Sequence, residues 1–189
     1  MLKCTLVEIE PLLAESFAPY GQIIAQGAKP TFSGPHVAGW RMKFGAEGPV
    51  DVMLNRFAHL PMEFSEMERH FNVTQSFIPL GGSPSVMVVA PPSERKGTGG
   101  RPRPDAVRAF YVDGSQGVLL WKGTWHALTR FPVRPPHADI VMITGLDTQL
   151  ELEKQNSDGS VPVLTEVCDF AETDGVTFKV VDPRGLIRS

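Results

Sequence analysis

Short apolar stretches separated by glycine- and proline-containing turns recur along this chain, and they constrain its fold more than any other feature. Six stretches are rich in β-branched and aromatic residues and alternate with an approximate period of two, as strands do. Gly81-Gly82 and Asp113-Gly114 lie between such stretches, where hairpin turns need residues that accept positive φ. The predicted strands are residues 52–57, 76–80, 86–90, 107–112, 117–121 and 139–144.

Composition favours an all-β sandwich or barrel. The 189 residues include 17 prolines and 18 glycines, which favour many short elements over long helices. The length suits one domain, residues 1–189, with a core large enough to fold alone. Residues 91–104 and 155–160 have no periodicity and are predicted as surface loops. A late strand is predicted at 161–167, within a tail after residue 150 that we expect to be variable.

One short helix is predicted near the N-terminus, over residues 10–17. Pro11 is tolerated in a first helical turn, and the sequence PYG at 19–21 would end the helix. Its predicted buried face consists of Leu12, Leu13 and Phe17.

Charge and hydropathy argue against two classes of partner. The net charge is −3, and the basic residues are scattered apart from those in residues 95–103, whereas a nucleic-acid site needs a basic stripe that neutralises several phosphates. The longest apolar runs, residues 86–90 and 140–143, are too short to cross a bilayer. We therefore expect neither nucleic acid nor a membrane as a partner.

The N-terminus and the cysteines predict a cytoplasmic protein. Glu8 and Glu10 follow Lys3 closely, which is unlike the opening of a secretory signal. Cys4 and Cys168 lie near opposite ends of the chain and form no C-x-x-C pair. Because they could bridge only if the fold brought them together, we expect reduced thiols.

Two segments place a histidine in a patterned context. Residues 68–82 read E-x-H, four residues, Q, six residues, G, and residues 121–126 read W-x-G-x-x-H. These spacings resemble the two motifs of the cupin superfamily, H-x-H, four residues, E, six residues, G and P-x-G-x-x-H. In that superfamily the four polar side chains point into a β-barrel and hold a divalent metal. Here Glu68, Gln75 and Trp121 replace a histidine, a glutamate and a proline of those motifs.

The replacements leave the chemistry of the site open. Glu68, His70 and His126 offer two imidazoles and a carboxylate, a set that can hold Ni, Zn, Mn or Fe with positions left for water or substrate. Gln75 is a poor ligand because its oxygen is neutral. The same four groups could equally hydrogen-bond a polar substrate without a metal. A further alternative is an exposed edge strand in which the Glu-Arg-His sequence forms only ion pairs.

A closer resemblance is to the ureidoglycolate lyase family. It is carried by NR at 55–56, LP at 60–61, MERH at 67–70, TQSFIPL at 74–80, RAF at 108–110, GSQGV at 114–118, WH at 125–126 and FAPYGQII at 17–24. It covers roughly residues 6–145. The resemblance implies a mainly β, cupin-like double-stranded β-helix barrel with a few short helices, and a homodimer. One departure is Ala127, where members of the family often have a second histidine.

The resemblance also implies an activity, the cleavage of (S)-ureidoglycolate to glyoxylate and urea in allantoin and purine breakdown. A base must take the hydroxyl proton, an acid must protonate the departing urea nitrogen, and a cation must hold the carboxylate. His126 is the first choice for proton transfer, because imidazole titrates near neutral pH. Glu68 is its partner, and His70 shares the base role or binds a metal.

The substrate-binding prediction comprises four further residues. Gln75 has an amide donor and an acceptor that suit a ureido group. Arg56 and Arg69 are candidates for the carboxylate, since a guanidinium binds it with two parallel hydrogen bonds. Strand alternation should turn Arg69 away from its neighbours Glu68 and His70, which favours Arg56. The same set contains Asn55 and Trp125.

Two other functions stay open on the sequence. One is a metal-dependent cupin enzyme that acts on another small hydroxy acid. The other is a small-molecule binding protein that kept the pocket and lost the chemistry, an interpretation to which Ala127 lends support.

Overall fold

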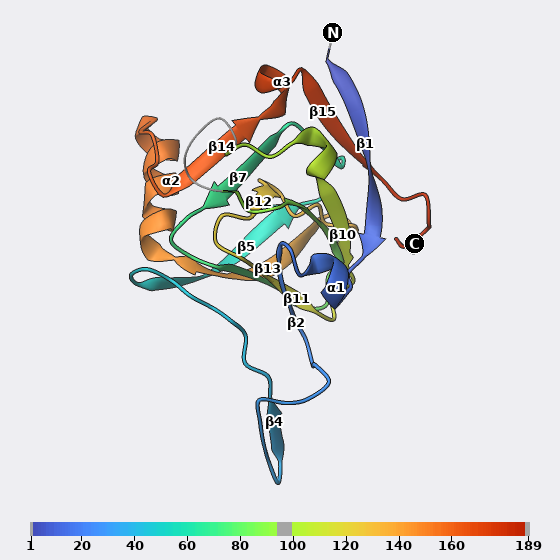
Figure 1. The fold of residues 1–189 in the computed structure, drawn as a ribbon, viewed down its shortest axis with the longest axis vertical. Coiled ribbons are helices and arrows are strands. Elements are labelled where there is room, and N and C mark those ends of the chain that lie inside the picture. The colour runs from blue at the N-terminus through green and yellow to red at the C-terminus, as the bar shows by residue number, and fades with distance from the viewer. Residues whose placement is uncertain (1, 94–99, 188–189) are drawn as a thin grey trace.

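Two β-sheets face each other and form the body of the molecule (Figure 1). The computed structural model describes residues 2–93 and 100–187, and within them the strands form an eight-stranded sheet, a five-stranded sheet and a two-stranded hairpin. The larger sheet has the spatial order β14 (Thr165–Asp169), β7 (Glu66–His70), β12 (Trp125–Ala127), β9 (Ser85–Ala90), β10 (Arg108–Val112), β1 (Lys3–Pro11), β15 (Val176–Val181) and β6 (Glu63–Phe64). The smaller sheet has the order β2 (Gly21–Ile24), β11 (Gly117–Leu120), β8 (Gln75–Pro79), β13 (His137–Gly145) and β5 (Val50–Ala58).

Most neighbouring strands are antiparallel, but β1 pairs in parallel with both β10 and β15. Helix α2 (Leu146–Asp158) packs beside β13 and β5, and α3 (Phe170–Thr173) packs against β15 (Figure 1). The prediction of a mainly β, cupin-like fold with a few short helices is confirmed. In the described part of the chain no helix is long and apolar enough to cross a membrane.

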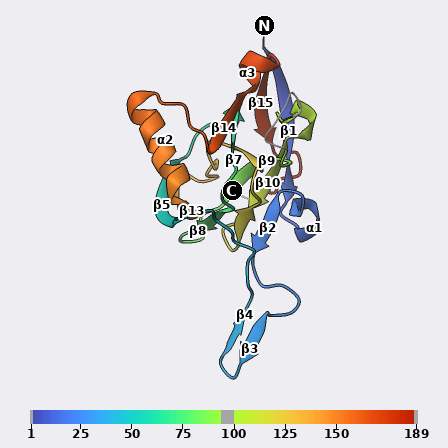
Figure 2. The same ribbon diagram turned by 60° about the vertical axis from the view of Figure 1, so that its left-hand side comes forward.

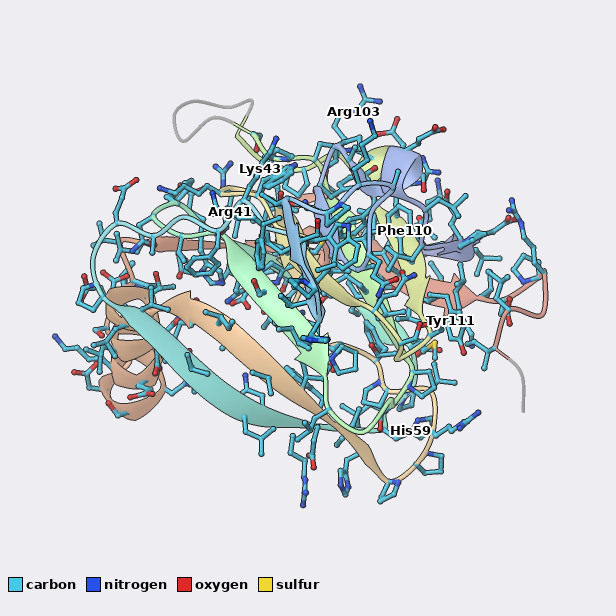
Figure 3. All side chains as sticks on the ribbon, turned by 90° about the horizontal axis from the view of Figure 1, so that it is seen from below. Arg41, Lys43, His59, Arg103, Phe110 and Tyr111 are labelled. Carbon is cyan, nitrogen blue, oxygen red and sulfur yellow. The ribbon has the colours of Figure 1, made fainter. Side chains whose placement is uncertain are left out.

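The larger sheet separates two cores, and its central strands β9 and β12 are buried on both faces. The side chains between the two sheets form what we call the inner core: Phe17, Tyr20, Phe77, Met87, Val89, Phe110, Val112, Val118, Leu120, Ile140 and Met142. The opposite face forms the outer core: Val7, Ile9, Met67, Val86, Val88, Ala90, Val107, Ala109, Trp125, Ala127, Phe131, Cys168, Phe170, Val176, Phe178 and Val180. Because side chains alternate along a strand, adjacent residues such as Val88 and Val89 enter different cores. Phe110 and Tyr111, both labelled in Figure 3, follow the same rule: Phe110 belongs to the inner core, and Tyr111 packs at the edge of the outer core.

A hairpin of β3 (Phe32–Gly34) and β4 (Val37–Gly39) projects from the body as an arm (Figure 2). Its base is held by local hydrogen bonds, among them one from Trp40 Nε1 to the Gly27 carbonyl at 3.0 Å. The arm itself is solvent-exposed, and Phe32 retains 56% of its surface.

Each of the six predicted strands overlaps an observed one, whereas the predicted helix at 10–17 is wrong in its first half. Pro11 belongs to β1, where it pairs with Tyr111, and helix α1 covers only Ala14–Phe17. Phe17 is buried as expected, but Leu13 is 58% exposed. Pairing with a distant strand overrides the local helix signal here.

The loop predicted at 155–160 is wrong in its first four residues, because α2 continues to Asp158 and ends with Gly159 at a φ of 73°. The only buried residue of this helix is Thr148, whose hydroxyl donates to Asn72 Oδ1 at 2.7 Å. A helix with so little apolar surface has no hydrophobic period to detect.

The remaining predictions on segments and cysteines have simple outcomes. The late strand predicted at 161–167 is shifted to β14, and the predicted loop 91–104 contains residues 94–99, which lie outside the described residues. The 3₁₀ turn η1 (Pro104–Ala106) follows that loop. Cys4 and Cys168 are both free, the first exposed and the second buried.

We expect Arg69 to be a major contributor to stability. Its side chain is fully buried on the outer-core side, lies 4.6 Å from the Trp125 ring centroid and donates to Glu166 Oε2 at 2.6 Å and to Ser93 Oγ at 2.8 Å. Arg69→Ala removes this packing and these bonds and should lower the free energy of unfolding by about 2–4 kcal/mol, measured by urea denaturation. Arg56→Ala is the matched control, because Arg56 forms an exposed ion pair with Asp139 and should have little effect. Equal destabilisation by the two variants would contradict this assignment.

Candidate functional site

The register of strands β7 and β12 brings the predicted cluster together. His126 lies directly opposite Glu68 in the antiparallel pair, and His70 follows on the same face of β7 two residues later. The turn before β12 is fixed by Gly123, whose N–H donates to the His70 carbonyl at 2.7 Å. Gly123 has a φ of 77°, a conformation that favours glycine and explains its place in the W-x-G-x-x-H sequence. Glu68, His70 and His126 therefore meet at the inner core, as the motif spacing predicted.

The three side chains lie close together but form no hydrogen bonds with one another. Glu68 Oε1 lies 3.9 Å from His70 Nε2 and 3.8 Å from His126 Nδ1, and the imidazole centroids are 5.2 Å apart. The side chains of His70 and His126 are 3% and 1% exposed, and that of Glu68 is 16% exposed. The cluster is thus shielded by protein, with access for solvent or ligand at the carboxylate.

His70 is positioned by its neighbour across the sheet. Thr165 pairs with His70 in the β14–β7 register, and its Oγ1 lies 2.8 Å from His70 Nδ1. His70 Nε2 is buried and has no hydrogen-bond partner. If Nδ1 donates to the hydroxyl, Nε2 carries the lone pair that a base or a metal ligand needs.

His126 has two competing neighbours at Nδ1. The Ala127 carbonyl and Arg130 Nη2 each lie 3.2 Å from this atom, and the first requires an N–H there while the second requires a lone pair. His126 Nε2 is buried without a partner, like His70 Nε2. The tautomer with the proton on Nδ1 leaves Nε2 free to accept a proton or to bind a metal.

Arg130 belongs to the site and was missed by sequence reasoning. It is 3% exposed, and its guanidinium carbon lies 4.0 Å from the ring centroid of Phe77. No motif contains it, because it follows β12 in an irregular segment, and a single arginine there carries no local signal. Only the packing of that segment against the inner core brings the guanidinium to His126.

Gln75 lies in the inner core as predicted. Its Nε2 donates weakly to Thr144 Oγ1 at 3.4 Å, and its Oε1 is buried without a partner. The buried side-chain atoms without partners in the described residues are His70 Nε2, Gln75 Oε1, His126 Nε2 and Arg130 Nε. Buried polar atoms are normally satisfied, and three of these four belong to neighbouring residues, His70, His126 and Arg130, so this region is suited to a polar ligand that would satisfy them.

Burial shifts every titratable group of the cluster toward its neutral form. Desolvation raises the pKa of the Glu68 carboxyl to about 7, although the nearby Arg130 opposes this rise. Desolvation, helped by Arg130, lowers the pKa of His70 to about 3 and that of His126 well below its usual range. Desolvation also lowers the pKa of Arg130 to about 10, with Glu68 acting in the opposite direction. Near neutral pH both imidazoles are therefore unprotonated, and Glu68 is present in both forms.

Arg56 and Trp125, two of the predicted substrate-binding residues, lie away from the cluster. The Arg56 side chain is 64% exposed and is held by Asp139 through two hydrogen bonds of 2.8 and 2.9 Å. Trp125 is part of the outer core and donates from Nε1 to Ser93 Oγ at 3.0 Å. Strand alternation explains both placements, because each residue is adjacent to an inward-facing one. Asn55 faces inward, and its Nδ2 lies 3.6 Å from Met142 Sδ.

The Ala127 departure does not alter the site. Ala127 follows His126 on β12, so its side chain points to the outer core and is fully buried there. The alanine therefore does not remove a polar group from the cluster around His126, and it gives no support to a function limited to binding.

The cluster fits a divalent metal by its donor atoms. One ligand atom from each of Glu68, His70 and His126 lies within 4.8 Å of the others. Both histidines have a buried Nε2 without a partner, which is the form of nitrogen that a metal binds. Gln75 adds a neutral oxygen that can hydrogen-bond a bound water or substrate.

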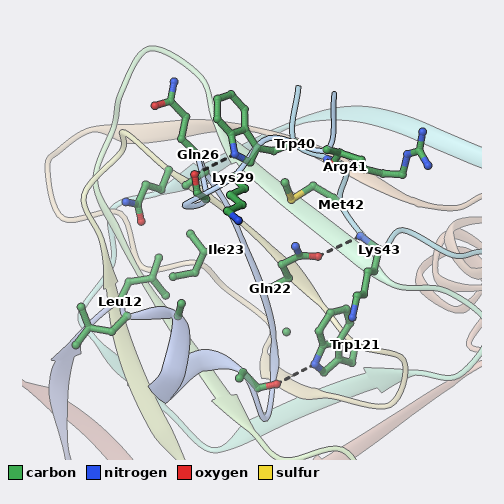
Figure 4. A pocket seen from close by; sticks show the side chains of 18 residues that line it. Leu12, Gln22, Ile23, Gln26, Lys29, Trp40, Arg41, Met42, Lys43 and Trp121 are labelled. Carbon is green, nitrogen blue, oxygen red and sulfur yellow. Dashed lines mark hydrogen bonds between the residues drawn. The ribbon is translucent and has the colours of Figure 1, made fainter. Parts of the chain in front are cut away.

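A separate cavity of about 620 Å³ lies between α1, β2 and the base of the arm (Figure 4). Its lining contains Lys29, Arg41 and Lys43 together with Trp40 and Trp121, and none of the cluster residues. Trp121, which replaces the proline of the cupin motif, points into this region and donates from Nε1 to the Ala18 carbonyl at 3.0 Å. Its role is therefore outside the polar cluster.

Comparison with known proteins places the chain in a family. A model of the family described as "Ureidoglycolate lyase" matches residues 4–163. This chain belongs to the ureidoglycolate lyase family. The ureidoglycolate lyase of Azotobacter vinelandii is 34% identical over 130 residues, which are 64% of this chain and 75% of the relative. Those of Burkholderia mallei and Pseudomonas aeruginosa are 36% and 34% identical over 132 and 129 residues, each 64% of this chain and 72% and 73% of the relatives.

We expect this family member to lose stability as Glu68 ionises. The Glu68 carboxyl has a pKa of about 7 in the folded protein and an ordinary value of 4.5. Its contribution to the free energy of unfolding is therefore fully present below about pH 4.5 and is lost as the pH rises through 7. Glu68→Gln, which cannot ionise, should be more stable than wild type by about 3 kcal/mol at pH 8 and nearly equal at pH 4.5. Urea denaturation of both proteins with a chelator present measures this difference. A difference that does not change with pH would contradict the raised pKa.

Proposed function

We propose that this chain cleaves (S)-ureidoglycolate to glyoxylate and urea, in the breakdown of purine-derived ureides. Membership of the ureidoglycolate lyase family supports the substrate. The observation that carries the chemistry is the convergence of Glu68, His70 and His126, whose ligand atoms lie within 4.8 Å of one another and whose two histidines each have a buried nitrogen without a partner. A small polar molecule could satisfy these atoms, and a larger one would meet the apolar side chains of the inner core.

The reaction moves one proton and breaks one bond. The hydroxyl proton leaves the substrate, the carbon–oxygen bond becomes the carbonyl of glyoxylate, and the electron pair of the carbon–nitrogen bond departs with the urea nitrogen, which takes up a proton. No water is consumed. The protein must therefore supply one base and one acid on either side of the same carbon.

His126 and Glu68 suit these two roles. With Nδ1 donating to the Ala127 carbonyl, His126 Nε2 is an unprotonated base directed into the protein interior. Glu68, with a pKa of about 7, is protonated in much of the population at neutral pH and can donate to the urea nitrogen. His126 gains one proton on Nε2 and Glu68 loses one in each turnover, so a proton must pass from His126 back to Glu68 before the next turnover.

His70 and Gln75 complete the proposed site. His70, positioned by Thr165, offers a second unprotonated nitrogen that can share the base role or bind a metal. Gln75 can accept from a ureido N–H through Oε1, which has no partner in the described structure. Glu68, His70 and His126 are the residues that would hold a Ni, Zn, Mn or Fe ion, which would polarise the substrate oxygen and so favour loss of its proton.

The test is glyoxylate release from freshly prepared ureidoglycolate. We expect wild type to release glyoxylate and His126→Ala to do so at least about 100-fold more slowly, the usual effect of losing a proton-transfer group. His36→Ala is the control, since His36 lies on the exposed arm, and it should match wild type. Absence of release by wild type would exclude the lyase activity.

A chelator-treated sample in the same assay distinguishes metal binding by the cluster from proton transfer by the cluster. Loss of release that one equivalent of metal restores would assign Glu68, His70 and His126 as metal ligands. Such a result would also justify testing the same protein on other small hydroxy acids, the substrates of the alternative metal-dependent enzyme. Retained release would assign these residues to proton transfer.

We also propose that the protein is a cytoplasmic homodimer. The outer surface of β5, an edge strand, exposes Val52 at 66% and Leu54 at 60%, and the arm exposes Phe32. A second copy would cover such apolar surface, which single soluble chains seldom leave open.

Light scattering should give a dimer for wild type and a monomer for Val52→Glu. The control Val161→Glu changes an equally apolar residue that is 87% exposed and belongs neither to β5 nor to the arm, and it should stay dimeric; a monomeric wild type would exclude the proposal.

A further inference from the structure

Arg130 is a buried cation that forms no ion pair with a carboxylate of the described residues, and Glu68 is the carboxyl that acts on it electrostatically. Its Nη1 donates to the carbonyls of Ala127 and Thr129, its Nη2 lies beside His126, and its Nε has no partner. No carboxylate of the described chain forms an ion pair with it. Because an unpaired buried charge is strongly unfavourable, such a group is expected to acquire a counter-ion from outside the chain.

The guanidinium is placed at the site by rigid neighbours. It lies over Phe77, with its carbon 4.0 Å from the ring centroid, and is 5.8 Å from that of Phe57. The next residue, Phe131, has a φ of 36°, a left-handed conformation that is rare outside glycine, and its side chain enters the outer core. The backbone at Phe131 therefore turns sharply, which leaves Arg130 in the inner core beside His126.

The other arginines considered for a ligand carboxylate cannot serve. Arg56 is exposed and bonded to Asp139. Arg69 points to the outer core and is bonded to Glu166 and Ser93. Arg130 alone among these three combines burial, contact with the cluster and a free donor.

We propose that Arg130 binds the carboxylate of the ligand and makes the site selective for small hydroxy acids over neutral ureides. The identity of the ligand rests on the proposed lyase function, whereas the need for an anion rests on Arg130 itself. A buried guanidinium stacked on an aromatic ring is already desolvated and oriented, so little free energy is lost in ordering it when a carboxylate binds. The carboxylate bound by Arg130 would place the adjacent hydroxyl-bearing carbon near His126 and Glu68.

The test compares a charged and a neutral substrate in Arg130→Met. The neutral compound is N-(hydroxymethyl)urea, which lacks only the carboxylate of ureidoglycolate and breaks at the same carbon–nitrogen bond. We expect Arg130→Met to lower kcat/KM for ureidoglycolate about 100-fold, mostly through KM, and to leave that for N-(hydroxymethyl)urea within about threefold of wild type. Arg134→Met, at an exposed arginine four residues away, should match wild type with both compounds.

The melting temperature and a second variant distinguish a loss of substrate binding from a loss of folding. The melting temperature of Arg130→Met should not fall below that of wild type, because methionine fills the space near Phe77 without burying a charge. If the melting temperature does fall, Arg130→Lys is used in place of Arg130→Met. Lysine keeps the charge but loses the planar donors, so kcat/KM for ureidoglycolate should fall by a smaller factor. An equal loss with the charged and the neutral compound would overturn the proposal.

Binding of glycolate keeps this proposal distinct from the lyase activity. Isothermal titration calorimetry should show that wild type binds glycolate and that Arg130→Met binds it about 100-fold more weakly. This result would hold even if wild type released no glyoxylate, in which case the lyase proposal fails and the carboxylate site stands. Equal glycolate affinity in the two proteins would overturn the role of Arg130 whatever the activity.

Discussion

The burial of both faces of the eight-stranded sheet at its central strands is the constraint on which the rest of this molecule depends. With a core on each side, residues 67–70 of β7 and all of β12 alternate between the two sides of the sheet. A slip of one residue in β7 would exchange Glu68 and His70 with Arg69. The register is held by β14 and β12 on the two sides of β7, and by the bond from Gly123 to the His70 carbonyl. The geometry of the Glu68, His70 and His126 cluster and the stability of the fold thus rest on the same strand pairing.

The inner core contains a polar cluster that folding alone does not explain. Two neutral imidazoles, a carboxyl with a raised pKa and an amide oxygen without a partner all disfavour the folded state when no ligand is present. The surrounding apolar side chains supply the stability that tolerates them. The same desolvation holds His70 and His126 unprotonated and Glu68 near its midpoint at neutral pH, which are the states that proton transfer requires.

Arg69 and Arg130 show how one residue type serves two purposes in this fold. Both are buried and both contact aromatic rings. Arg69 is bonded to Glu166 and Ser93 on the outer-core side, so its charge is satisfied within the chain. Arg130 faces the polar cluster without a carboxylate of the described chain bonded to it, so its charge is available to a ligand. Arg69 and Arg130 therefore differ in whether the chain provides a bonded carboxylate, and not in how deeply they are buried.

The sequence by itself determined the strands, the family and the core of the site. The period of two placed Glu68 and His70 on one face and Arg69 on the other, because side-chain alternation is a local property of a strand. Local sequence could not decide which face lies inside, so Arg56 and Trp125 were assigned to a site from which their strands turn them away. Helix α2 was missed because it buries almost no apolar surface. Arg130 was missed because its position depends on how an irregular segment packs against the inner core, and such contacts between distant residues exist only in the tertiary structure.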